Sequence, residues 1–306
     1  MILLLIEMQI LYLLKNYIKM IQVSIDNEVA AKDISIIIPV KDNQKGIEKL
    51  LNTLEKVTKS THYPKEVIIV DNLSKKPIYI EKKFSFNVIL EACKIPGPAA
   101  ARNHGAIRAK GRWLLFMDSD CIPTETTISG FLTNQNNSVA YAGNVQSFDN
   151  NYLSNYYDLR KTLVPPAIEV EGINSPKYLV TANCLIYSQV FQLSNGFDIN
   201  FQQAGGEDVD LGIRLSRYGH ISYQYTSLIQ HQFKNNIFDF IKRFYRYGKG
   251  NKQVALKHNI SFSPTLKFPK KIPLIYLILA ILEYCITKIG YELNYFMGLE
   301  DSQMKS

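Results

Sequence analysis

Short apolar runs that alternate with helical patterns constrain the fold of this chain more than any other feature. The run 34–38 is rich in isoleucine and is followed by a proline, as expected for a buried parallel strand. Similar runs follow at 66–70 and 113–117, with a weaker one at 88–90. An apolar stripe at helical spacing follows the first run, and an alanine-rich stretch that opens at Gly97 precedes the last. This alternation predicts a doubly wound α/β fold, in which helices flank a mostly parallel sheet.

Charged side chains stand where these predicted strands end. Asp71 closes the second run, Arg102 lies in the alanine-rich stretch, and Asp118 and Asp120 come directly after the last run. Ligands of doubly wound sheets bind at the carboxyl ends of the strands, so these side chains are expected to converge on a nucleotide-type site. Paired carboxylates suit Mg²⁺ or Mn²⁺, and an ion so held can bind a diphosphate, although a solvated turn is the alternative. No Gly-x-Gly-x-x-Gly motif follows the first run, which disfavours a dinucleotide cofactor.

Five short segments together resemble the sequence pattern of family 2 glycosyltransferases, which are inverting enzymes of the GT-A fold. The segments are IIIPV at 36–40, VDN at 70–72, GPAAARN at 97–103, DSD at 118–120 and GGED at 205–208. They occur in the order and approximate spacing of the family, and five in order are much more specific than any one. The resemblance covers about residues 33 to 250 and implies a GT-A-type sheet.

The resemblance implies a binding role for several residues at the predicted strand ends. Pro39 and the residues after it would line the base and ribose pocket, and Asp71 would hydrogen-bond the nucleobase. Many members have a second aspartate where Asn72 stands, so the identity of the base stays open, with a UDP-sugar favoured. Arg102 would reach the nucleotide, and Asp118 would contact the ribose or the water shell of the metal.

The resemblance also implies a metal site and a catalytic base. Asp120 would ligate Mn²⁺ or Mg²⁺ directly, and His231 falls where some relatives supply another metal ligand. Asp208 would deprotonate the acceptor hydroxyl, while Glu207 would position the acceptor or the helix. Inverting transfer is a single displacement that needs a base and neutralisation of the leaving diphosphate, which fits these roles. The alternative for Glu207 and Asp208 is helix capping, which contributes roughly 0.5–2 kcal/mol.

The carboxyl-terminal part combines a basic segment with an apolar one. The segment 232–272 has ten basic residues and one acidic residue, Asp239, so its net charge of +9 exceeds the formal net charge of +8 of the whole chain, and the remainder is close to neutral. The basic residues are Lys234, Lys242, Arg243, Arg246, Lys249, Lys252, Lys257, Lys267, Lys270 and Lys271. A solvated helix face is one reading, and nucleic acid is disfavoured because no recognised module is present. An anionic membrane surface is favoured because the apolar run 273–282 follows, which suits an interfacial helix. A span through 273–291 that buries Glu283 stays open.

The chain is expected to contain one catalytic domain with an extension at each end. Segment 1–30 is apolar but broken by Glu7 and Gln9, lacks the features of a signal peptide, and predicts an amphipathic helix. The catalytic domain is expected at 31–235, followed by a basic then apolar helical extension at 236–306. Four scattered cysteines fit a reducing cytosol, so we expect an enzyme at the cytoplasmic face of the membrane.

The function predicted is metal-dependent inverting transfer of a sugar from a nucleoside-diphosphate sugar to a hydroxyl acceptor, in cell-surface glycan assembly. The acceptor would be a glycan or lipid-linked, and its pocket is expected from 145–178 and the carboxyl-terminal segment. A sugar nucleotidyltransferase is an alternative, but the sequence 40–43 lacks the glycine- and lysine-rich loop expected there. The other alternative is a non-catalytic, membrane-associated protein that binds nucleotide sugars. The presence of Asp118, Asp120 and Asp208 argues against it.

Overall fold

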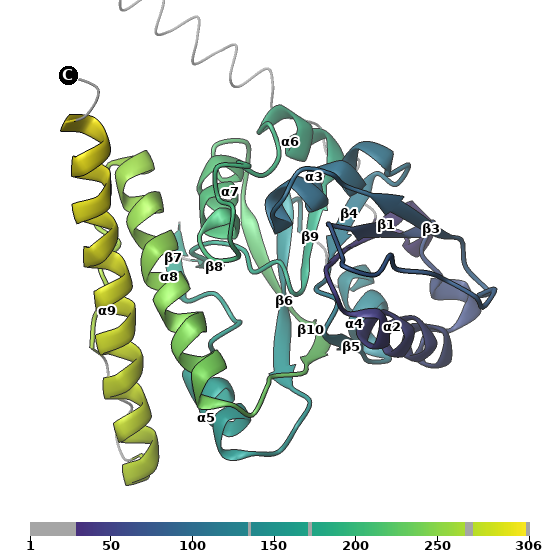
Figure 1. Cartoon of the computed structure of the whole chain (residues 1–306). Coiled ribbons are helices and arrows are strands. Elements are labelled where there is room, and N and C mark those ends of the chain that lie inside the picture. The colour runs from purple at the N-terminus through teal and green to yellow at the C-terminus, as the bar shows by residue number, and fades with distance from the viewer. Residues whose placement is uncertain (1–28, 134–135, 171–172, 267–271, 304–306) are drawn as a thin grey trace, which may run out of the picture.

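The computed structural model describes residues 29–133, 136–170, 173–266 and 272–303 (Figure 1). Helices cover both faces of a central sheet, and two long carboxyl-terminal helices stand together at one side of it. The amphipathic helix predicted for 1–30 lies outside the described residues, except for its last two positions.

The first four strands form the parallel half of the sheet, in the order β3-β2-β1-β4. Their bounds are β1 (Ile34–Val40), β2 (Glu66–Asp71), β3 (Val88–Ala92) and β4 (Trp113–Phe116). Ile36 and Ile38 share a core cluster with helix α2 (Gln44–Val57). Ile37 belongs to a cluster on the other face, with helix α3 (Pro98–Arg108). Because alternate residues of a strand point to opposite faces, the run of isoleucines is buried between two helical layers, as predicted.

Two of the other four strands run against the rest, and together the four bring distant segments to the same edge. Their bounds are β5 (Cys121–Pro123), β6 (Ala140–Ser147), β9 (Cys184–Tyr187) and β10 (Ile221–His231). Strand β9 is antiparallel to β4 and β6, β10 is parallel to β6, and β5 is antiparallel to β10. The sheet is therefore mostly parallel, as predicted, in the order β3-β2-β1-β4-β9-β6-β10-β5. His231 pairs with Cys121, which places the end of β10 beside the residues that follow β4.

Short helices and a small hairpin complete the catalytic part. They are η1 (Ala31–Asp33), η2 (Ser60–His62), α4 (Thr126–Ser129), η3 (Gly130–Leu132), α5 (Tyr152–Arg160), β7 (Ala167–Val170), β8 (Ile173–Pro176), α6 (Ser188–Leu193) and α7 (Glu207–Leu215). Leu211 and Leu215 of α7 pack with Val190 of α6 in the cluster that contains Ile37. Helix α7 therefore covers the same face as α3, and its first residues are at the site (Figure 1).

The carboxyl-terminal helices α8 (Ile237–His258) and α9 (Leu274–Gln303) run parallel and side by side (Figure 1). Phe240 and Leu279 share a core cluster with residues of α5. Further along, Gly248 is so close to α9 that a Cβ atom there would be 2.1 Å from the carbonyl oxygen of Thr287. The apolar run 273–282 is thus the start of a longer helix, and the predicted helical extension is confirmed.

Helix α9 has an inner and an outer side of different character. On the inner side the guanidinium of Arg160 is 3.2 Å from Glu283, whose carboxylate also accepts a hydrogen bond from Tyr156. The outer side exposes a stripe of apolar side chains, which are Leu274, Ile275, Ile278, Ile281, Ile289 and Leu293. Among the described residues, Leu274–Leu293 is long and apolar enough to cross a membrane, a test that core helices of soluble proteins also pass.

All four cysteines are free thiols. Cys93, Cys121 and Cys184 are buried, whereas Cys285 is exposed on α9. Cys121 directly follows the Asp-Ser-Asp motif, and burial raises the pKa of its thiol well above the ordinary value, with Asp118 and Asp120 adding to the effect. Its thiol is therefore part of the packing beneath the site.

Candidate active site

A single large cleft of about 1310 Å³ opens at the carboxyl ends of the parallel strands and extends to α8 and α9. Its lining includes all but one of the site residues predicted from the sequence, which are Pro39, Arg102, Asp118, Asp120, Glu207, Asp208 and His231. Asp71 is the exception. The topology explains the convergence, because the ends of β1, β4 and β10 and the start of α7 meet at one edge of the sheet.

Asp71 and Asn72 organise the loops that follow β2, beside one end of the cleft. The carboxylate of Asp71 accepts hydrogen bonds from the backbone N–H groups of Ser74 and Ile78, at 3.0 and 3.1 Å. Asn72 lines the cleft, and its side chain accepts a hydrogen bond from the Gly97 N–H at 2.9 Å. Asp71 therefore holds its own loop, and contact between its carboxylate and a nucleobase stays a prediction.

Asp118, Asp120 and His231 form a cluster in which one possible ligand atom from each lies within 4.8 Å of the others. Nε2 of His231 is 3.2 Å from Oδ1 of Asp120, while its Nδ1 is buried without a hydrogen-bond partner. Burial works to raise the pKa of Asp120, but His231 and Arg243 outweigh it, so that the pKa lies below its ordinary value. Two carboxylate oxygens and an imidazole nitrogen at this spacing can hold a divalent metal ion.

Arg102 joins the two acidic motifs from a buried position. Its Nη2 is 2.7 Å from Oδ1 of Asp118, and its Nη1 is 2.9 Å from Oε1 of Glu207. The side chain is only 3% exposed. Burial opposes its charge, but Asp118 and Glu207 prevail and raise the pKa of the guanidinium. Because Arg102 directs its donors at protein carboxylates, it fixes the relative positions of both motifs, and direct contact with a nucleotide stays a prediction.

Glu207 and Asp208 begin α7, and two glycines shape the turn before it. Gly205 and Gly206 have φ angles of +127° and +103°, which residues other than glycine rarely adopt. The Gly205 N–H donates to Oε2 of Glu207 at 2.6 Å, and the Val209 N–H donates to Oδ1 of Asp208 at 2.9 Å. Glu207 thus holds the turn that precedes α7 in addition to its ion pair with Arg102, and the N-cap position itself is Gly206.

The pKa of the Asp208 carboxyl is raised to near neutrality. Burial in the cleft, and then the charge of Glu207, raise its pKa to about 7, while Arg102 works in the opposite direction. A carboxylate with this pKa is half ionised at pH 7 and can accept a proton more readily than an ordinary aspartate.

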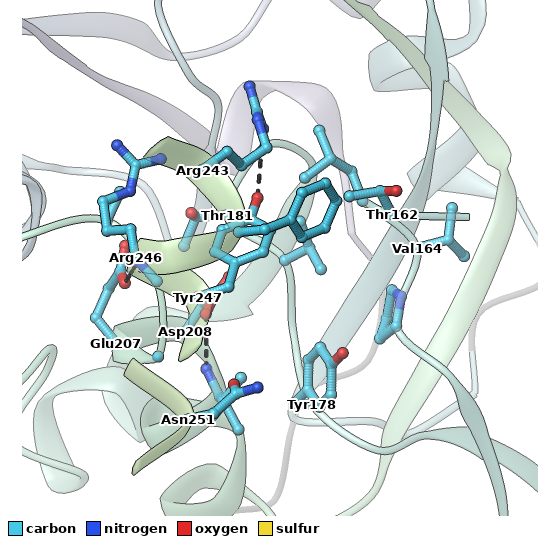
Figure 2. A pocket seen from close by; sticks show the side chains of 18 of the residues that line it. Thr162, Val164, Tyr178, Thr181, Glu207, Asp208, Arg243, Arg246, Tyr247 and Asn251 are labelled. Atoms are coloured by element: carbon cyan, nitrogen blue, oxygen red, sulfur yellow. Dashed lines mark hydrogen bonds between the residues drawn. The ribbon is translucent and has the colours of Figure 1, made fainter. Parts of the chain in front are cut away.

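Helix α8 supplies site residues that the sequence analysis assigned only to a basic segment. Arg243, Arg246 and Tyr247 line the cleft, and Figure 2 shows them beside Asp208 and Glu207. Nη1 of Arg243 is 3.3 Å from the Tyr247 hydroxyl, and its charge influences Asp120. The spacing i, i+3 and i+4 places the three side chains on one side of the helix, and this signal could have separated them from the exposed lysines.

The far half of the cleft lies beyond Asp208 and has an aromatic lining. Its walls are formed by the segment after α5, the turn at Tyr178, the middle of β10, and the residues 261–266 that return from α8 to α9. Glu283, Tyr284 and Thr287 complete it from the inner side of α9. Figure 2 shows Thr162, Val164 and Tyr178 on this side of Asp208.

Known proteins share the fold of this chain and part of its sequence. The mannosyltransferase PcManGT from Pyrobaculum calidifontis, solved in complex with GDP-Man and Mn²⁺, has a TM-score of 0.52 at 12% identity, over 94% of this chain and 82% of that one. GalNAc-T7, solved with UDP, GalNAc and Mn²⁺, has a TM-score of 0.51 at 13% identity, over 75% of this chain and 55% of that one. At such identities the likeness shows a common GT-A-like fold.

Relatives at the sequence level are glycosyltransferases. A pre-mycofactocin glycosyltransferase of Mycobacterium tuberculosis is 26% identical over 243 residues, which is 76% of this chain and 50% of the relative. An uncharacterised glycosyltransferase of Haemophilus influenzae is 40% identical over 88 residues, 28% of this chain and 29% of the relative. The chain thus spans about half the length of the mycobacterial relative. The model for glycosyl transferase family 2 matches residues 35–192, more than half of the sequence, and the chain therefore belongs to glycosyl transferase family 2.

Proposed function

We propose that this protein transfers a sugar from a nucleoside-diphosphate sugar to a hydroxyl group, with inversion at the anomeric carbon. One observation carries the proposal: the Asp118, Asp120 and His231 cluster and the carboxyl of Asp208 open on the same cleft. Arg102 links the two through Asp118 and Glu207. The site therefore has a place for a leaving diphosphate and a base on the acceptor side, which are the two requirements of a single displacement.

The donor would lie along the ends of β1 and β4, with its diphosphate at the metal cluster. Asp120, Asp118 and His231 would hold the metal, and a bound ion would supply charge neutralisation to the leaving diphosphate. We favour Mn²⁺ over Mg²⁺, because an imidazole ligand suits the softer ion and the two solved proteins of this fold contain Mn²⁺. Pro39 would line the base pocket, and a UDP-sugar is the favoured donor.

Asp208 would act as the base in the reaction. Its ionised carboxylate takes the proton from the acceptor hydroxyl while the acceptor oxygen bonds to the anomeric carbon and the bond to the diphosphate breaks. Glu207 would keep this carboxyl in place through Arg102 and the Gly205 N–H. Arg243, whose charge already acts on Asp120, would stabilise the negative charge that builds on the diphosphate.

Donor binding and hydrolysis across a panel of nucleotide sugars test this function, with Mn²⁺, with Mg²⁺ and with EDTA. We expect Asp120→Ala to lose metal-dependent donor binding, and Asp208→Asn to bind the donor but lose turnover. Binding without turnover in the wild type would favour the non-catalytic alternative. Formation of a nucleotide sugar from a nucleoside triphosphate and a sugar phosphate would favour the nucleotidyltransferase.

We also propose that α9 lies along the cytoplasmic face of a membrane, in cell-surface glycan assembly. The outer stripe of α9, defined above, supplies an apolar surface, and the basic residues of α8 suit anionic lipid. A spanning α9 is disfavoured, because Glu283 is paired with Arg160 and Gly248 of α8 packs against it. Co-sedimentation with anionic vesicles should fall when Ile278 and Ile281 are replaced by glutamine, and unchanged binding would refute this orientation.

A further inference from the structure

The far half of the cleft carries an excess of positive charge. Lys161 and Lys177 line it, Arg246 lies beside Glu207 in the same cleft (Figure 2), and no ion pair among the described residues includes any of the three. Glu283 is the acidic residue on this wall, and its charge is already matched by Arg160 at 3.2 Å. Among the residues that the structure describes, these three cations therefore have no ion-pair partner.

Of the three cations, Arg246 has the most unusual surroundings. It is half-buried on α8 beside Glu207, and its Nε atom is buried with no hydrogen-bond partner in the described part of the chain (Figure 2). A guanidinium presents five donors and a fixed charge, so leaving it partly buried without an acceptor is unfavourable. A bound anion would satisfy both its donors and its charge, whereas the hydroxyl groups of an uncharged glycan would satisfy only the donors.

The two lysines extend the same charge along the wall. Lys161 ends α5 with a φ of +51° at the rim, and Nζ of Lys177 is 5.2 Å from the centre of the Phe262 ring. Exposed lysines are commonly solvated and alone would imply little, but here they border the cleft that contains Arg246. In the same cleft, the stacked rings of Tyr223 and Tyr225, with centroids 4.6 Å apart, offer flat apolar surface of the kind on which sugar rings pack.

We infer that the acceptor carries an anionic group, a phosphate or a carboxylate, next to the hydroxyl that receives the sugar. This inference rests on the proposed function and names the class of acceptor. The diphosphate of the donor is expected at the other end of the cleft, where Asp118, Asp120 and His231 gather and Arg243 faces Asp120. The charge around Arg246 and the lysines is therefore available to a second anion.

The test compares matched acceptors that differ only in charge. Alkyl glycosides, the same glycosides bearing a phosphate, and the corresponding uronic acid glycosides are assayed with the donor that the wild type hydrolyses. We expect KM for the phosphate or carboxylate form to be lower by about tenfold or more, as one charge-assisted hydrogen bond allows. Attaching the same phosphate to a long-chain lipid in vesicles distinguishes a headgroup from a soluble glycan phosphate as its source.

Single substitutions then assign the preference to residues. Arg246→Gln and Lys177→Gln should each raise KM for the charged acceptor by about tenfold while the donor Kd stays the same. Lys249→Gln, half-buried on the same helix, and Lys234→Gln, exposed before it, do not line the cleft and are the matched controls. Lys177 is exposed, so Lys177→Gln is expected to fold and still measures the effect on KM if Arg246→Gln misfolds.

The outcomes separate this inference from the function on which it rests. Equal KM values for charged and uncharged acceptors, with donor hydrolysis intact, would overturn the inference and leave the proposed transferase in place. A higher donor Kd in Arg246→Gln would also overturn it, because Arg246 would then serve the diphosphate. Failure of the wild type to bind any donor would instead overturn the proposed function.

Discussion

Replacing Asp208 with asparagine should stabilise the fold at alkaline pH, because the native carboxyl is ionised there at a cost. Its folded pKa is about 7, against an ordinary value of 3.8. A raised folded pKa means that the contribution of this group to stability is fully present below about pH 4 and is lost as the pH rises through 7. A difference of about three in pKa corresponds to about 4 kcal/mol, an upper bound because solvent enters the cleft.

Asparagine is a suitable probe because it keeps the shape and the oxygen that accepts a hydrogen bond from the Val209 N–H. Urea unfolding of both proteins should give a higher free energy of unfolding for Asp208→Asn, by roughly 1–4 kcal/mol at pH 8. This advantage should grow from about pH 4 to about pH 7 and stay constant above that. The variant should be inactive, so stability and turnover would change in opposite directions.

Asp198 provides a control of opposite sign. Burial works to raise its pKa, but Lys257 and the Asn200 N–H outweigh it, so that the pKa is lowered. Asp198→Asn should therefore lose stability at pH 8 and approach the wild type as the pH falls below about 4. Identical pH dependence of Asp208→Asn and wild type, or a less stable Asp208→Asn at pH 8, would refute the reasoning about the cleft.

Three further predictions concern the supports of the site. Arg102→Met should lower the free energy of unfolding in urea by about 3–5 kcal/mol, because two carboxylates lose their cation. Arg102→Lys should retain only part of the lost stability. A loss below about 1 kcal/mol in Arg102→Met would argue against a bridging role. His231→Gln should weaken Mn²⁺ binding in calorimetry by at least about tenfold, and unchanged affinity would exclude it as a ligand. Gly248→Leu should force α9 away from α8, lower the Tm and raise the acceptor KM, whereas an unchanged Tm would contradict the close helix contact.

The parallel half of the fold could be read from the sequence because its signals are local. Each strand from β1 to β4 is a short apolar run, and the stripe that forms α2 has helical spacing. The other half depends on pairings between distant segments. Strand β10 lies between β6 and β5, and the pairing of His231 with Cys121 is what brings an imidazole to Asp120. Periodicity indicates where a strand lies but not which distant strand it pairs with.

The site was predictable where a residue stands at a strand end, and less so where a side chain acts through others. Arg102 was expected near the nucleotide, yet its direction toward Asp118 and Glu207 depends on α7, which begins more than a hundred residues later. Arg243 and Arg246 were counted as part of a basic surface because net charge does not say which side of a helix faces a cleft. Their i, i+3 spacing was the available signal.

The distribution of the thiols gives this chain a built-in reporter. Three of the four cysteines are buried, while Cys285 is exposed in the middle of the outer side of α9. A maleimide dye should therefore attach to Cys285 in the unmodified sequence without a cysteine-free background. Its emission would shift to the blue if this side of α9 enters lipid and would self-quench if two copies meet there. The same label thus distinguishes the two surroundings in a single titration.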